Sequence, residues 1–131
     1  MKARSVSICF RGFDVPPSQV ESIVGIPATL TGKKGDSVRP GVSAILKRSF
    51  VHYSVDFPGG SRLDEMVQTA LDRLGGVQHL CEVRDRVQPE FLEIEIMLPV
   101  KHSEEQEGGL LSNAVLTEMV KLHASLSFGF V

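Results

Sequence analysis

The chain has 131 residues, a length typical of one domain, and its formal net charge at pH 7 is −2. With 42% hydrophobic and 23% charged residues, its composition is that of an ordinary globular protein and argues against intrinsic disorder. No cluster of Lys or Arg supplies the positive field that nucleic-acid binding needs, and no apolar run approaches the ~20 residues that cross a bilayer. We therefore expect one domain over residues 1–131 that binds neither nucleic acid nor membrane.

The cysteines and the first residues indicate a compartment. Cys9 and Cys81 are separated by most of the chain and do not form a disulfide framework. Ser5, Ser7 and Arg11 interrupt the apolar core that a signal peptide would need. We expect a cytoplasmic protein with free thiols.

The first third of the chain predicts a strand, a short helix and a long loop. Residues 5–12 alternate between apolar and polar side chains, as a strand with one buried face does. Pro16 and Pro17 can open a helix, which Gly25 is placed to end. Residues 28–48 carry repeated glycines, prolines and basic side chains, which indicate either a mobile loop or an ordered element without a regular pattern.

The rest of the chain alternates strands with helices. Strands are predicted at 49–57 and 91–98, helices at 61–74 and 77–86, and a last helix after Ser112 that leads into a strand ending near Phe130. Because each strand has one polar face, we expect an α+β two-layer sandwich with a mostly antiparallel or mixed sheet of about four strands and helices on one face. The predicted core comprises Ile8, Phe10, Leu71, Ile94, Ile96 and Phe128.

Several short motifs occur in an order that is characteristic of one family. They are the opening strand, the start of the first helix at Pro16-Pro17-Ser18, its exit at Gly25-Ile26-Pro27-Ala28-Thr29, the Lys34-Gly35-Asp36 turn, and the helix that runs into a strand over 116–130. In these features the chain resembles, nearly end to end, the bacterial family catalogued as domain of unknown function 4279. Members often carry a tryptophan after the Gly-Asp turn, whereas this chain has none. The resemblance implies a shared fold and no catalytic residue.

The polar faces of the strands hold the candidate chemistry. Cys9 and His52 fall on neighbouring predicted strands and are the one nucleophile–base pair that the pattern allows. A small, half-buried and unreactive side chain is the more ordinary role for a cysteine. Glu93 and Glu95 alternate along one strand and form either paired carboxylates or a solvated face. Ser54 lies on the same predicted face.

Other polar clusters in the sequence indicate a binding or metal site less strongly. Lys33 and Lys34 lie in a glycine-rich turn whose backbone could bind an anion, but its spacing is not that of a phosphate loop. The four histidines have no metal-ligand spacing, so we expect no metal and no cofactor. An acidic run at 104–107 is either a solubilising loop or a contact for a basic partner.

The sequence thus favours a binding module over an enzyme. An immunity-type protein that neutralises a toxin domain and an enzyme that uses the polar face of the sheet are the alternatives. The expected partner is a second copy or another protein, bound through that polar face. No catalytic residue is assigned, and the candidate binding residues are Cys9, His52, Ser54, Glu93, Glu95, Lys33 and Lys34.

Overall fold

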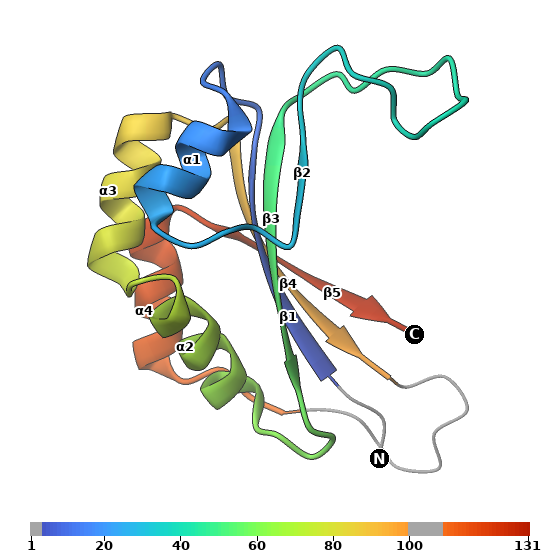
Figure 1. The fold of residues 1–131 in the computed structure, drawn as a ribbon. Helices are drawn as coiled ribbons and strands as arrows, with labels where there is room; N and C mark the ends of the chain where they lie inside the picture. Colours follow the sequence, from blue (N-terminus) through green and yellow to red (C-terminus); the bar gives the residue numbers. More distant parts are fainter. Residues whose placement is uncertain (1–3, 100–108) are drawn as a thin grey trace.

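Four helices pack on one face of a five-stranded sheet in residues 4–99 and 109–131, which are the residues that this computed structural model describes (Figure 1). The strands are β1 (Arg4–Arg11), β2 (Leu30–Gly32), β3 (Phe50–Phe57), β4 (Phe91–Leu98) and β5 (Ser125–Phe130). The helices are α1 (Pro17–Val24), α2 (Leu63–Arg73), α3 (Val77–Val87) and α4 (Asn113–Leu122). The predicted α+β class is confirmed.

The sheet is mixed, with strand order β2-β3-β1-β4-β5. β1 lies at the centre and is antiparallel to both β3 and β4, and β2 is antiparallel to β3. β5 runs parallel to β4. A parallel pair needs a crossover connection, and α4 supplies it here.

The expectation of about four strands is wrong by one, because β2 lies inside the segment 28–48. β2 is three residues long, too short for its alternation to be seen in the sequence. Further along, the Val38 N–H donates to the Ala44 carbonyl (2.9 Å), and the Leu46 N–H donates to the Asp36 carbonyl (2.8 Å). The segment thus contains a short strand followed by a small antiparallel excursion, which projects away from the helices (Figure 1).

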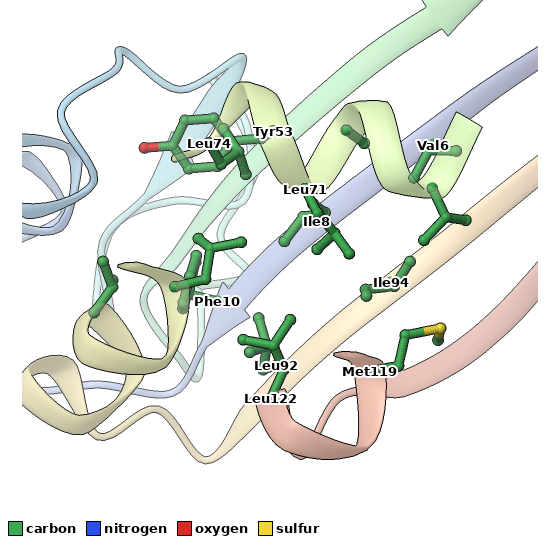
Figure 2. Packing of buried hydrophobic residues seen from close by; sticks show 14 of the residues in the cluster. Val6, Ile8, Phe10, Tyr53, Leu71, Leu74, Leu92, Ile94, Met119 and Leu122 are labelled. Atoms are coloured by element: carbon green, nitrogen blue, oxygen red, sulfur yellow. The ribbon is translucent and has the colours of Figure 1, made fainter. Parts of the chain in front are cut away.

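The core lies between the sheet and the helices (Figure 2). β1 contributes Val6, Ile8 and Phe10, which are at most 2% exposed, and β4 contributes the fully buried Ile94 and Ile96. The helices face them with apolar stripes at helical spacing. These stripes include Met66, Val67, Ala70 and Leu71 of α2, Leu80 and Val83 of α3, and Val115, Met119 and Leu122 of α4.

Local contacts fix where the helices begin and end. α1 starts at Pro17 and stops at Gly25, whose φ of 94° is left-handed and suits glycine. The Tyr53 hydroxyl donates to the Ile26 carbonyl (2.9 Å) and so ties the exit of α1 to β3. Burial raises the pKa of Tyr53 to about 12. Ser112 caps α4 as predicted, accepting the Val115 N–H (3.3 Å).

Phe128 does not belong to the core, so that part of the prediction is wrong. It lies on the same sheet face as Ile96, its register partner in β4, but it remains 46% exposed. β5 is an edge strand, and the helix layer covers its apolar face incompletely.

Replacing Ile94 with Ala should lower the free energy of unfolding by about 2–5 kcal/mol, because it leaves a cavity between β4 and the helices. Chemical denaturation measures the change. The matched control is Leu30→Ala at the exposed edge, which should stay within about 0.5 kcal/mol of wild type. Equal stabilities for the two variants would show that Ile94 is not part of the core.

Candidate functional site

The polar face of the sheet, opposite the helices, carries a shallow depression of about 70 Å³. Its lining consists of Ser7, Cys9, Arg11, His52, Glu93, Glu95 and Ser127, which come from β1, β3, β4 and β5. The name "polar face" is used below for these side chains together with their strand neighbours on the same side of the sheet. Because β1 is central, Cys9 has His52 as its register partner on one side and Glu93 on the other.

Arg11 organises one end of the polar face. Its Nε donates to the Glu93 carboxylate (3.0 Å), and its Nη2 approaches the Cys9 sulfur (3.8 Å). Its guanidinium lies 5.6 Å from the centre of the Phe50 ring. Since Arg11 and Glu93 are both partly exposed, the ion pair contributes only about 0–1 kcal/mol to stability. Together the three contacts hold the Arg11 side chain beside Glu93, Cys9 and Phe50.

A second contact joins β4 to the edge strand. The Ser127 hydroxyl donates to the Glu95 carboxylate (3.4 Å), and these two residues are register partners. Glu95 is also the register partner of Ser7 on β1. Glu93 thus accepts from Arg11 of β1, whereas Glu95 accepts from Ser127 of β5. They do not form a pair of carboxylates that converge on one reacting atom.

Cys9 is buried, with only 5% of its surface exposed, although none of the four described helices covers it. It is short and lies between longer neighbours on β3 and β4. Burial raises the pKa of the Cys9 thiol, Arg11 opposes that shift, and Glu93 adds to it. The thiol is therefore protonated at neutral pH, whereas the nucleophilic species is the thiolate.

His52 lies next to Cys9 in the register but is not its base. Burial lowers the pKa of His52, and the carboxylate of Glu95 partly offsets this effect. The imidazole is consequently neutral near pH 7. The hydrogen bonds described for the Cys9 sulfur go to the Phe10 carbonyl and to Arg11 (3.8 Å each), so no nucleophile–base pair is assembled.

The size of the depression limits what it can bind. Sites that enclose a small molecule usually measure ≈ 300–1,000 Å³. A volume of about 70 Å³ is too small for that purpose, even before its openness to solvent is considered.

The remaining predicted residues divide between two places. Ser54 lies on β3 on the polar face, where it pairs with Ser7, and its N–H donates to the Thr29 hydroxyl (3.0 Å). Lys33 and Lys34 lie in the turn after β2, where the Lys34 N–H donates to the Ser49 hydroxyl (2.9 Å). The two lysines are exposed and do not line the depression.

The structure therefore brings Cys9, His52, Glu93 and Glu95 together and leaves the lysines apart. The residue that sequence reasoning missed as a candidate is Arg11. Arg11 is two residues after Cys9 in the first strand, so the alternation of the strand already places both side chains on the same face.

Within residues 4–99 and 109–131, no three His, Cys, Asp or Glu side chains come close enough together to hold a metal ion. Each helix in those ranges falls short of the length and apolarity that crossing a membrane requires. The acidic residues Glu104, Glu105 and Glu107 lie outside the described residues.

Comparisons with protein-family models, with curated proteins and with solved structures found no match. The resemblance to the family of domain of unknown function 4279 stays a prediction.

The surroundings of Cys9 predict how the alkylation of its thiol depends on pH. In a Cys81→Ser background, the rate of alkylation at Cys9 should rise with pH about a midpoint above the ordinary thiol value of ≈ 8.5. Glu93→Gln should move that midpoint down, because the neighbouring negative charge is removed. Arg11→Gln should move it up, because the stabilising positive charge is lost.

The pH dependence of alkylation, followed by mass spectrometry, measures these midpoints. A Cys9 midpoint at or below 8.5 would mean that the thiol is activated and would favour the enzyme alternative over the binding module.

Proposed function

We propose that this protein is a binding module that docks another protein through the polar face of its sheet. The helices occupy the opposite face, and among the described residues no helix packs on the polar one (Figure 1). The observation that carries the proposal is a set of arginine–phenylalanine contacts at one end of this face.

Arg11 lies between Phe50 of β3 and Phe91 of β4, which are its register partners on either side. Arg48 places its guanidinium 5.3 Å from the centre of the Phe91 ring and pairs with Glu90 (3.0 Å). Phe91 is 44% exposed. Two cations stacked on two rings form a preorganised surface, so little conformational freedom is lost when a partner binds.

The composition of this surface fits a partner that associates and dissociates. Arginine and aromatic residues are enriched at interface hot spots, while the interface as a whole stays as polar as the general surface. Interfaces between identical copies are more apolar than that. Of the two occupants that the sequence left open, a different protein therefore suits the polar face better than a second copy does.

The same geometry disfavours the enzyme alternative. The buried thiol has a raised pKa, the adjacent imidazole is not hydrogen-bonded to it, and the depression is small. A cytoplasmic location remains part of the proposal, and two free thiols accord with a reducing compartment.

Position-specific cross-linking tests the proposal. A photoreactive amino acid at Ser54, on the polar face, should capture the partner in cells of the source organism. The same amino acid at Glu65, on the exposed side of α2, should not. Mass spectrometry identifies the captured protein, and a toxin domain among the products would specify the immunity-type form of binding.

Affinity measured with the purified partner makes the test quantitative. Ser54→Arg and Phe91→Ala should each weaken binding by about tenfold or more, as expected at a contact centre, whereas Glu65→Arg should change it less than about twofold. Calorimetry gives the dissociation constants and circular dichroism confirms the fold. Unchanged affinity in both polar-face variants would contradict the proposal.

A further inference from the structure

The outer edge of β5 is a long unprotected strand edge. Among the residues that the structure describes, no strand pairs with β5 on the side away from β4. The strand reads Ser-Leu-Ser-Phe-Gly-Phe over Ser125–Phe130 and contains no charged residue and no proline. Natural proteins usually blunt an exposed edge with such residues or with a bulge, because its free backbone groups pair readily with another chain.

The direction of the backbone groups follows from one hydrogen bond. Val131 donates its N–H to the Leu98 carbonyl of β4 (3.0 Å). Successive residues of a strand turn their backbone groups to opposite sides. The N–H and C=O groups of Leu126, Phe128 and Phe130 therefore point outward, away from β4.

An apolar groove runs beside this edge. It has a volume of about 500 Å³ and lies between β5 and the start of α4, with Leu110, Leu116, Phe128 and Phe130 in its lining. Phe130 is 64% exposed and Leu116 is 41% exposed. Val120, one helical turn beyond Leu116, is 72% exposed. Backbone edge and side chains thus offer pairing and burial at the same place.

The area is close to what a dimer needs. Together with Val131, these side chains leave on the order of 600 Å² of apolar surface exposed, which equals the largest patch expected on a monomer. A standard interface buries about 800 Å² per partner. Pairing of the strand backbone would bury the remainder.

We propose that a second copy of this chain covers the edge through antiparallel pairing of the two β5 strands about a twofold axis. In the register that uses every outward group, Phe128 lies opposite Phe128 of the other copy and Leu126 lies opposite its Phe130. Such residues exchange both of their backbone hydrogen bonds. The interface is isologous, so the apolar surface of each copy meets the same surface of the other.

The opposite edge of the sheet shows why β5 is the site. β2 has only three residues, and Lys33 and Lys34 follow it directly. A short strand flanked by lysines is a common protection against edge pairing. β5 has twice that length and no such protection.

Sedimentation equilibrium from micromolar to millimolar concentration tests the proposal. Wild type should dimerise. Phe130→Lys and Val120→Lys should each weaken the dimer by roughly 30-fold or more, the effect of losing a central contact. The matched control, Leu30→Lys at the β2 edge, should leave the dissociation constant unchanged.

Val120 is on the solvent side of α4, so its variant should fold normally, and circular dichroism checks this. A wild type that stays monomeric at millimolar concentration, or a dimer unaffected by both lysine variants, overturns the proposal. The edge would then be open to an extended segment of a different protein.

Disulfide trapping tests the register itself. In a Cys9→Ala, Cys81→Ser background, Phe128→Cys should form a covalent dimer on oxidation, since opposed Cα atoms lie ≈ 5.5 Å apart in such a pair. Leu30→Cys is the control and should not link. A Phe128→Cys chain that sediments as a dimer but remains unlinked overturns the antiparallel register.

Discussion

The pairing of β1 with a strand on each side is the constraint on which the rest of the structure depends. Its apolar residues, Val6, Ile8 and Phe10, meet the helices, so the residues between them must occupy the opposite face. A slip of one residue against β3 or β4 would exchange the two faces and expose the core. The register that buries Phe10 is thus the register that places Cys9 beside His52 and Glu93.

That constraint explains why the faces were predictable from the sequence. Alternation is a local property, and it correctly separated Ile94 and Ile96 from Glu93 and Glu95. The state of Cys9 was not predictable in the same way. Its burial comes from side chains on β3 and β4, and its raised pKa depends on that burial. A free thiol beside a histidine resembles a reactive pair in sequence, whereas in the structure burial raises the pKa of that thiol and its hydrogen bonds go to Phe10 and Arg11.

The failures of prediction have a common cause, which is the position of a strand in the sheet. The apolar residues Leu126, Phe128 and Phe130 correctly indicated a strand with one apolar face. Whether that strand is central or at an edge depends on the parallel crossover through α4, for which the local sequence has no signal. For the same reason β2 was missed, because a three-residue strand exists only through its partner β3.

Pairing of two copies through β5 would fix how their polar faces are arranged relative to each other. A twofold axis that joins two β5 strands in one sheet is perpendicular to that sheet, so both polar faces lie on the same side. Met97 lies over its register partner Gly129, where a Cβ atom would collide with the Met97 sulfur. The assembly would present two clusters of arginine–phenylalanine contacts, one from each copy, on the same side of the joined sheet. Binding at the second cluster would then be intramolecular, and the avidity would exceed the affinity of either cluster alone. An edge that encourages pairing is therefore compatible with a polar face whose individual contacts are weak.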